Sequence, residues 1–480
     1  MRVKKNKRYL YLMVLGALFV FFLTVFDATT PSLYFYLSVG LFFILLFLVY
    51  LNFFYLILIA FVILPLTFKL SQLQLAVGFL LFFLDNKTLS FDLYTLFYFF
   101  LMVVIFIEIL VRKPKIHQKP LFWIILAAIF LNLLSFVTSV NRLEGINEVI
   151  IFLGSFGAYY LGLVFFNSKK KYVQALSLVL MSSIIPILTG VFQIITGSFF
   201  YSGDVGLPRI RSTFFQPNNF GMFLMIVSIC ALGLLLAVLK DQKNKKVTVI
   251  LSISLLISVI FLLLTFNRSS WINFALAVGV FSLIKKEIRK YTIFGGLMIV
   301  AIIFLFDIFR NRIFELFDPY MYDTIYVRAE IWDKALFAFK KKPLLGYGFG
   351  MFEEVIRSVQ GYEEGLVHSH SDHFQVLIER GIVGWIGYLL MMIGALYYSY
   401  KGIIKKASLR FKKIKFFNRT LNLDFKILTV IPLILFINMS LASFVEAPQV
   451  QYTFQFFSWF LLGSCLNAGE KELINKKEQL

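Results

Sequence analysis

The sequence predicts an all-α, polytopic integral membrane protein with about 12–14 transmembrane helices and one long helical extracytoplasmic loop. Of its 480 residues, 60% are hydrophobic and 15% are charged, whereas soluble domains are about 45–50% apolar and about 25% charged. The apolar residues form runs of about 15–25 residues, the length that crosses a bilayer as a helix. The basic residues gather in alternate connections between these runs. This composition excludes an ordinary soluble enzyme and a disordered chain.

Each apolar run predicts one helix. The runs lie at about 9–26, 33–50, 51–67, 91–111, 120–138, 148–166, 172–196, 219–239, 247–265, 270–284, 291–309, 381–400, 425–444 and 451–467. A further run at 73–84 is too short to span and is expected at the interface or as a re-entrant segment. Basic residues precede the first run and no small-x-small cleavage site follows it, which predicts an uncleaved first helix.

The distribution of positive charge predicts sidedness. With a cytoplasmic N-terminus, 31 of the 47 Lys and Arg residues fall in seven cytoplasmic segments. These segments are 1–8, 112–119, 167–171, 240–246, 285–290, 401–419 and 468–480. The net charge of +21 therefore follows from the positive-inside rule, and we expect no nucleic-acid partner. We predict a multi-pass protein of the cytoplasmic membrane with both termini cytoplasmic and residues 310–380 outside.

The remaining polar residues concentrate in three predicted outer loops, at 197–218, 265–270 and 310–380. The longest loop contains a helical pattern that begins near Asp323 and ends at Pro343. Glycines 346, 348 and 350 follow it. Their spacing is not that of a dinucleotide-binding motif and no strand precedes them, so we predict a tight turn.

Three of the four histidines, His368, His370 and His373, lie within six residues. The string fits the H-x-H-x-D-H signature of metallo-β-lactamase-type hydrolases. That fold needs further ligands downstream, and no histidine follows residue 373. The two cysteines lie inside apolar runs and give no zinc spacing. We therefore expect no metal and no cofactor, and we interpret the histidines as groups that exchange a proton near neutral pH.

Arginines are the second signal on the predicted outer side. Arg209 and Arg211 precede a helix that begins near Asn219, and Arg268 lies between two helices in a very short loop. An ionisable residue at membrane level is costly and suggests function, although Arg268 could instead extend toward lipid headgroups. Several guanidinium groups together can bind a diphosphate, because their planar fork matches phosphate oxygens.

Arg328 begins the helical pattern of the long loop. It could join the other arginines at the outer face, or it could form a surface salt bridge with Glu330 or Asp333. The sequence leaves both interpretations open.

Four segments carry a resemblance to a known family. They are 211–220 (RSTFFQPNNF), 265–270 (TFNRSS), 328–348, which contains RAEIW and KPLLGYG, and 370–384 (HSDHFQVLIERGIVG). From about residue 205 to 400 the chain resembles the O-antigen ligase and polymerase family. The resemblance defines a family core at 197–400, preceded by a transmembrane bundle at 1–196. A basic cytoplasmic loop and the last two helices follow at 401–480.

The resemblance implies a glycosyltransferase that uses neither nucleotide sugar nor metal. It implies that an undecaprenyl-diphosphate-linked oligosaccharide is the donor, that a glycan is the acceptor, and that membrane lipids, a flippase and a chain-length regulator are further partners. It places the catalytic histidine on His370, although Ser371 stands where the family commonly has Asn. It assigns the diphosphate to Arg211, Arg268 and Arg328. The supporting residues that it implies are His368, His373, Asn219 and Arg209.

The sequence favours a polysaccharide polymerase, for a capsular, exopolysaccharide or teichuronic-acid-like polymer. Its Lys-, Phe- and Ile-rich composition is typical of low-GC bacteria, and a Gram-positive member of that group would have no lipid A to serve as a ligase acceptor. A ligase of the same family is the first alternative. A polysaccharide transporter or flippase is the alternative from another class, although no half-repeat is visible.

Overall fold

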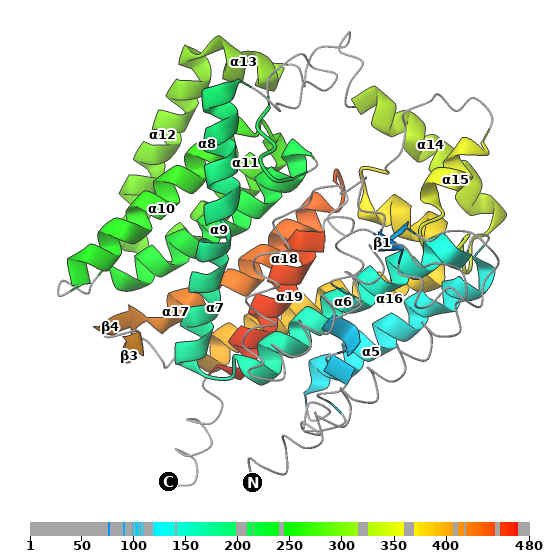
Figure 1. The fold of residues 1–480 in the computed structure, drawn as a ribbon, viewed down its shortest axis with the longest axis horizontal. Coiled ribbons are helices and arrows are strands. Elements are labelled where there is room, and N and C mark those ends of the chain that lie inside the picture. The colour runs from blue at the N-terminus through cyan, green and yellow to red at the C-terminus, as the bar shows by residue number, and fades with distance from the viewer. Residues whose placement is uncertain are drawn as a thin grey trace.

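The structure is a computed structural model. It describes residues 119–139, 142–197, 209–214, 216–239, 244–314, 325–359, 369–406, 411–416, 419–446 and 452–468, with short pieces between 75 and 109. Helices dominate these residues (Figure 1), so the predicted all-α class is confirmed.

The helices follow the predicted runs. In chain order they are α5 (Pro120–Leu133), α6 (Arg142–Phe165), α7 (Lys169–Ser182), α8 (Ile184–Thr196), α9 (Pro217–Val238), α10 (Lys245–Leu264), α11 (Arg268–Ile284), α12 (Arg289–Leu305), α13 (Asp307–Phe314), α14 (Ile325–Lys341), α15 (Phe352–Arg357), α16 (Asp372–Lys406), α17 (Phe425–Leu428), α18 (Ile431–Ala442) and α19 (Tyr452–Asn467). Two short 3-10 helices, Leu134–Thr138 and Lys286–Ile288, extend α5 and precede α12.

Seven segments among the described residues are long and apolar enough to cross a membrane, and α11 is a shorter apolar helix. The predicted total of about 12–14 spans also counts four runs before residue 112, which lie largely outside the described residues. Most of the predicted interfacial run at 73–84 lies outside them too. Within that run only β1 (Leu75–Ala76) is described, and it pairs with β2 (Ser90–Phe91).

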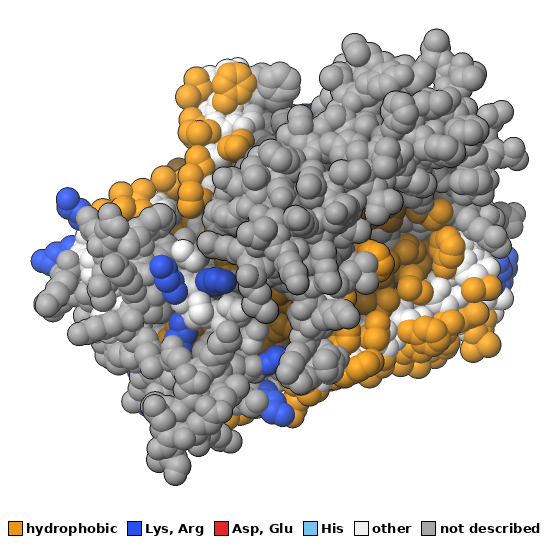
Figure 2. Space-filling view, turned by 60° about the horizontal axis from the view of Figure 1, so that its bottom comes forward, with side chains coloured by type: hydrophobic (Ala, Val, Ile, Leu, Met, Phe, Trp, Pro, Cys, Tyr) orange, Lys and Arg blue, Asp and Glu red, His pale blue; other side chains and the backbone are white. Residues whose placement is uncertain are grey.

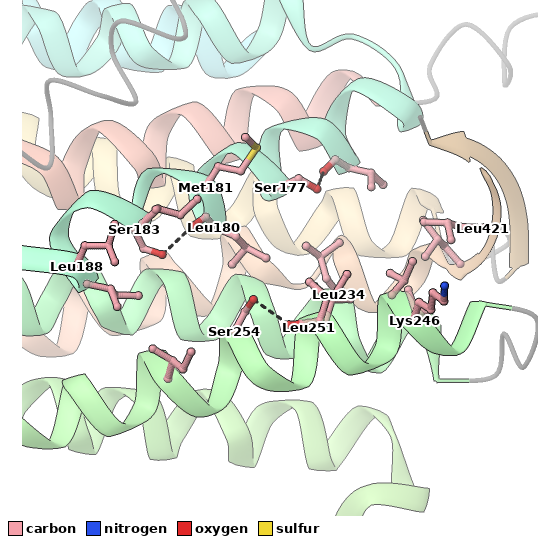
Figure 3. Close-up of a pocket in the computed structure, with 18 residues that line it drawn as sticks. Ser177, Leu180, Met181, Ser183, Leu188, Leu234, Lys246, Leu251, Ser254 and Leu421 are labelled. Carbon is pink, nitrogen blue, oxygen red and sulfur yellow. Dashed lines mark hydrogen bonds between the residues drawn. The ribbon is translucent and has the colours of Figure 1, made fainter. Parts of the chain in front are cut away.

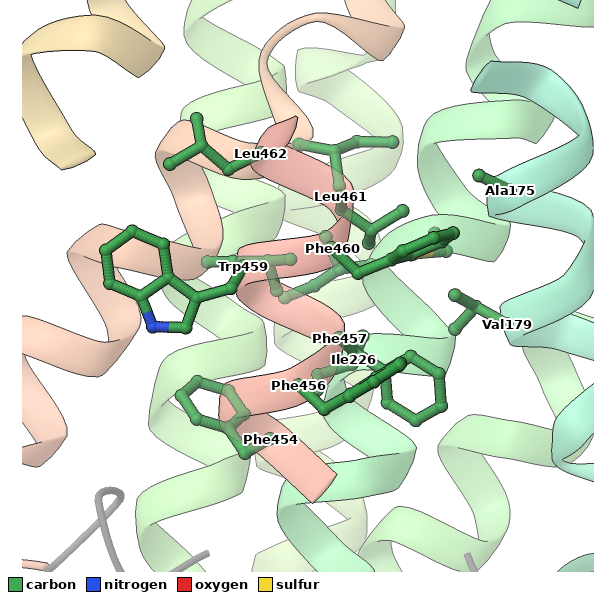
Figure 4. Close-up of a cluster of buried hydrophobic side chains, with 14 of the residues drawn as sticks. Ala175, Val179, Ile226, Phe454, Phe456, Phe457, Trp459, Phe460, Leu461 and Leu462 are labelled. Atoms are coloured by element: carbon green, nitrogen blue, oxygen red, sulfur yellow. The ribbon is translucent and has the colours of Figure 1, made fainter. Parts of the chain in front are cut away.

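Helix α19 forms the centre of the core. Its aromatic and leucine side chains point in several directions and meet α7 and α9, as Figure 4 shows for Phe457, Phe460, Val179 and Ile226. Helix α6 crosses α19 closely, because a Cβ on Gly162 would lie 2.1 Å from the Phe460 carbonyl oxygen. Small residues at such crossings let helix backbones approach within a membrane.

The connections gather at two ends of this bundle. At one end, the Tyr172 hydroxyl donates to the Leu428 carbonyl and the Lys285 ammonium donates to the Leu236 carbonyl. Lys and Arg side chains are visible on that face (Figure 2). Among the described residues, the connections predicted to share the cytoplasmic side therefore do share an end. The predicted outer connections meet at the opposite end, which we call the arginine end, and which side it faces remains a prediction.

The basic segment after α16 contains a hairpin that the sequence analysis did not predict. Strand β3 (Phe411–Phe416) pairs antiparallel with β4 (Arg419–Asp424). In β4, Leu421 and Leu423 are both buried, which is the period-two pattern of a strand with one covered face. The hairpin ends directly at α17.

Helix α16 begins at Asp372, nine residues before the predicted start at Gly381. Its backbone departs from helical geometry at Gly381, which has φ of 63°. A Cβ there would lie 2.2 Å from the Leu344 carbonyl oxygen, so only glycine fits. The predicted glycine turn packs against this kink, with Gly346 and Gly348 at φ of 67° and 107°.

Candidate functional site

The first part of the site is a junction between two predicted outer loops. Arg209 is buried, and its Nε donates to the Thr265 carbonyl at 2.9 Å. Its Nη2 donates to Asn218 Oδ1 at 2.6 Å. Asn267 Nδ2 donates to the Asn218 carbonyl at 3.1 Å. The segment before α9 is therefore fixed to the short loop between α10 and α11.

Arg268 is the first residue of α11. In the first turn of a helix, backbone N–H groups have no partner within the helix. The Asn267 side chain caps this helix by accepting from the Ser270 N–H at 3.2 Å. A Cβ on Gly221 would lie 2.9 Å from the Asn267 Cβ, so α9 approaches the loop closely. The predicted outer loop at 265–270 is shorter in the structure, because α10 ends at Leu264 and α11 already begins at Arg268.

Arg328 reaches from α14 to the connection that follows α18. Its Nη1 donates to the Val445 carbonyl at 2.6 Å, and its Nη2 lies 3.9 Å from Glu446 Oε1. Glu330 instead pairs with Lys334 at 2.5 Å. The alternative of a local surface salt bridge for Arg328 is therefore wrong.

Glu446 is the residue that the sequence analysis missed. It is buried, and burial raises the pKa of its carboxyl group. The positive charges of Arg328, Arg209 and Arg268 oppose this by lowering the same pKa, and the net shift is upward. The charges of three arginines therefore act on one carboxylate, and Arg328 is the one that lies within 3.9 Å of it. We call the four residues the arginine cluster. A lone acid in the short connection between the last two apolar runs was the available signal.

Two other predicted site residues are Arg211, expected to bind the diphosphate, and Asn219, expected in a supporting role. Arg211 is half-buried, and its carbonyl accepts from the Phe214 N–H in a turn. Asn219 is half-buried in the first turn of α9. Arg209, which was expected only in a supporting role, is the member of this segment whose charge acts on Glu446.

His370 lies in a loop that is anchored on both sides. On one side, Trp332 Nε1 donates to the Ser369 carbonyl at 2.8 Å. On the other, Ser371 Oγ donates to the Ser443 carbonyl at 3.0 Å. His370 itself is half-buried with φ of 48°, a left-handed conformation that is uncommon outside glycine. Such backbone strain often occurs at functional sites.

The anchors also join His370 to the arginine cluster. Trp332 and Arg328 are four residues apart on α14, and therefore lie on one face of that helix. Ser443 lies three residues before Glu446 in the same connection. The loop that holds His370 is thus tied to the two elements that hold the arginine cluster.

His373 has a different environment. Its Nδ1 accepts from Trp385 Nε1 at 3.1 Å, and an indole N–H can only donate. The proton of the neutral ring must then lie on Nε2, which is 3.2 Å from Ser443 Oγ. The ring also packs 4.5 Å from the Phe444 ring, centroid to centroid. His373 therefore bonds through Nδ1 to Trp385 of its own helix and through Nε2 to Ser443, which directly follows α18. His368 lies outside the described residues.

A buried polar chain runs from the His370 loop to the kink of α16. Ser369 Oγ lies 2.9 Å from Gln375 Oε1, and Gln375 Nε2 donates to Glu379 Oε1 at 2.7 Å. Arg380 lies 3.8 Å from Glu379 and donates to Asn132 Oδ1 at 3.0 Å. Two phenylalanine rings, Phe349 and Phe152, flank its guanidinium group. This chain fixes the glycine turn and the kink beside the site.

In the parts of the chain that the structure describes, no group of three His, Cys, Asp or Glu side chains could hold a metal ion. In the described part of the H-x-H-x-D-H string, His373 pairs with Trp385 and Ser443, and Asp372 lies 3.4 Å from the Tyr388 hydroxyl.

Comparisons with known proteins agree with the resemblance noted in the sequence. Residues 253–389 match the family model described as O-antigen ligase. A ComP-specific O-oligosaccharyltransferase of Acinetobacter baylyi is 25% identical over 313 residues, which cover 62% of this chain and 51% of that protein. An uncharacterized protein of Haemophilus influenzae is 21% identical over 183 residues, covering 34% of this chain and 46% of that protein. The chain thus spans about half the length of these curated relatives.

Proposed function

We propose, on the premise that the chain carries an O-antigen ligase domain, that it is a membrane glycosyltransferase with a lipid-diphosphate-linked oligosaccharide as donor. One observation carries the proposal. Arg328 lies 3.9 Å from Glu446, the charges of Arg209 and Arg268 also act on that carboxylate, and the same connection anchors the strained loop of His370. This arrangement supports a site in which cations for a leaving group and a candidate base act together.

The arginine cluster is suited to the departing diphosphate. When the bond between the anomeric carbon and the phosphate oxygen breaks, negative charge develops on that oxygen. Arg209 and Arg328 are already oriented by backbone carbonyls, so little reorganisation is needed to stabilise the charge. We expect the lipid to be undecaprenyl diphosphate, with its diphosphate between Arg209, Arg268 and Arg328.

His370 is suited to activating the acceptor. In the proposed step its ring nitrogen takes the proton of the acceptor hydroxyl, whose oxygen forms the new bond to the anomeric carbon. A histidine can do this near neutral pH without a metal. His373 does not fit this role, because Trp385 and Ser443 occupy both of its nitrogens.

Three possible activities differ in the acceptor of the oligosaccharide. Polymerisation of repeat units remains our first expectation, from composition. Ligation to another glycan carrier is the second. The Acinetobacter relative, a ComP-specific O-oligosaccharyltransferase, favours a third possibility, transfer to a protein. The same donor site serves all three.

The test of the transferase proposal is an in vitro assay with the purified full-length chain. A synthetic oligosaccharide on a polyprenyl diphosphate is the donor, and the products are separated by mass spectrometry. We expect free polyprenyl diphosphate and a longer glycan or glycosylated acceptor in equal amounts. Donor that crosses a vesicle membrane unchanged, with no new glycosidic bond, would instead support the transporter alternative.

A deletion strain distinguishes the acceptors. Accumulation of single repeat units on lipid indicates a missing polymerase. Accumulation of full-length polymer on lipid indicates a missing ligase. A normal polysaccharide together with an unglycosylated protein indicates a missing protein transferase.

A further inference from the structure

An apolar groove lies away from the arginine cluster. It has a volume of about 740 Å³, and α7, α8, α9, α10 and strand β4 line it (Figure 3). Lys246, the second residue of α10, lies at one end beside Leu421. This end lies at the end of the bundle where Tyr172 bonds to Leu428 and Lys285 bonds to Leu236. We call it the basic end, and it lies opposite the arginine cluster.

The wall of the groove offers almost no polar group to a ligand. Three hydroxyls line it, and each donates to a carbonyl of its own helix: Ser177 to Val173, Ser183 to Leu180, and Ser254 to Ile250. With these donors satisfied, leucine, isoleucine and valine side chains supply the remaining surface. Such a wall suits a hydrocarbon chain, because the wall leaves no buried donor unpaired.

The rim of the groove is apolar and open. Met181, Ile184, Leu188 and Ile250 line it, and each exposes more than half of its surface in the described structure. These residues belong to segments long and apolar enough to span a membrane. The groove therefore opens toward the bilayer interior and not toward water.

The length of the groove matches one leaflet. Along α10 it extends from Lys246 to Ile257, about 16 Å at the rise of an α-helix. The hydrocarbon core of a bilayer is about 30 Å thick. A chain that starts at Lys246 would thus end near the midplane, where an acyl chain of one leaflet also ends.

We propose that this groove binds one acyl chain of an anionic phospholipid whose phosphate contacts Lys246. The exposed Lys246 ammonium can pair with the headgroup while its methylene stem lies along Leu421 and Leu423. Basic pockets between transmembrane helices are known sites for anionic headgroups. The proposal does not depend on the transferase activity, because the groove lies at the opposite end of the bundle.

The experiment uses the full chain reconstituted in nanodiscs with photoreactive phosphatidylglycerol or photoreactive phosphatidylcholine. Mass spectrometry locates the cross-linked residues. We expect phosphatidylglycerol to label the groove walls on α7 and α10 several-fold more than phosphatidylcholine. The Lys246→Gln variant should lose this preference, whereas Lys245→Gln should keep it, because Lys245 is exposed on the same turn but does not line the groove.

A second pair of variants tests the groove itself. Ser254→Phe should fill the groove and reduce labelling by both lipids, whereas Ser252→Phe should not, because Ser252 lies on the same helix outside the lining. Thermal unfolding of each variant checks that it folds. Equal labelling by the two lipids, labelling confined to peptides of residues 1–70, or displacement of phosphatidylglycerol by polyprenyl diphosphate would each overturn the proposal.

Discussion

The two ends of the helical bundle treat positive charge differently. At the arginine end, Arg209 is 8% exposed and Arg380 is 6% exposed, and carbonyls, amides or aromatic rings hold each guanidinium. At the basic end, Lys245, Lys246 and Lys286 are exposed. Burial of a charge is costly unless it is paired. We therefore expect the buried charges at the arginine end to serve a function, whereas the exposed lysines at the other end are those that we predicted to lie on the cytoplasmic side.

Two lysines at the basic end are exceptions to this pattern. Lys169 is buried at the basic end, where its ammonium lies 5.9 Å from the Phe425 ring centroid. Lys285 donates to the Leu236 carbonyl. Each fixes a helix terminus, and neither belongs to a convergent set. The action of three arginine charges on Glu446, and not burial alone, distinguishes the arginine cluster.

The largest effect should come from His370→Ala. Loss of a general base costs about 10²–10⁴-fold in rate, so turnover should nearly disappear while donor binding and thermal stability persist. His373→Ala should behave in the opposite way, with a lower melting temperature and a smaller loss of turnover, because His373 connects α16 to Ser443, which directly follows α18. Turnover and thermal unfolding of both purified variants are the measurements.

Two outcomes would contradict this assignment. Full turnover in His370→Ala would move the base to His368 or His373. Equal losses in all three histidine variants, together with inhibition by EDTA and recovery with zinc, would support the metallo-hydrolase interpretation of the H-x-H-x-D-H string.

The arginine substitutions should come next in size. Arg268→Lys and Arg328→Lys keep the charge but lose the planar fork. Each charge-assisted contact contributes about 1.5–3 kcal/mol, so we expect a loss of roughly 10- to 150-fold in kcat/KM for the donor. Lys286→Arg at the basic end is the matched control and should change little. Normal kinetics in Arg268→Lys and in Arg268→Ala would remove Arg268 from the site.

Much of this comparison could be predicted from sequence, because it depends on local patterns. The apolar runs predict the spans, charge alternation predicts which connections share an end, and the loop around Arg268 is too short to leave the membrane surface. The glycine turn before Gly350 was also predictable, since glycine marks positive φ.

The other features of the site could not be predicted from sequence, because they depend on tertiary contacts. Glu446 lies more than 100 residues after Arg328 in the chain, so no local pattern joins them. Arg209 and Arg211 are equivalent in sequence, and only the hydrogen bonds of Arg209 to Thr265 and Asn218 separate them. Helix α16 starts early because the Asp372 N–H finds the Ser443 carbonyl at 3.0 Å.

The Glu446→Gln substitution should change kcat/KM for the donor less than the arginine substitutions do, and it should raise this value. Arg328 remains fixed by the Val445 carbonyl, so the substitution removes a negative charge without releasing the arginine. At an effective dielectric constant of about 20, a unit charge about 12 Å from a phosphate charge changes the affinity by about tenfold. We expect the donor KM to fall by about that factor at neutral pH.

The pH dependence follows from the raised pKa of the Glu446 carboxyl group. As pH falls through that pKa, the carboxyl becomes neutral, so the donor KM of the natural chain should fall at a pH above the ordinary range of a glutamate. Glu446→Gln should lack this dependence. A raised folded-state pKa also adds stability at acid pH that is lost as pH rises through it. A donor KM that rises in Glu446→Gln would mean that the carboxylate positions the arginines.

The smallest effects should occur at the basic end. Lys286→Gln changes an exposed side chain, and such substitutions usually alter stability by less than about 0.5 kcal/mol, so turnover and melting temperature should both stay unchanged.

The charge of Lys286 should matter for the orientation of the chain in the membrane, together with the other basic clusters. Reporter fusions near Lys341, in α14, and near Lys412, in β3, should report opposite sides of the membrane, because these residues lie at opposite ends of the bundle. Reporters on the same side would contradict the comparison. The arginine cluster and the exposed lysines would then face one compartment, and topology could no longer explain the lysines.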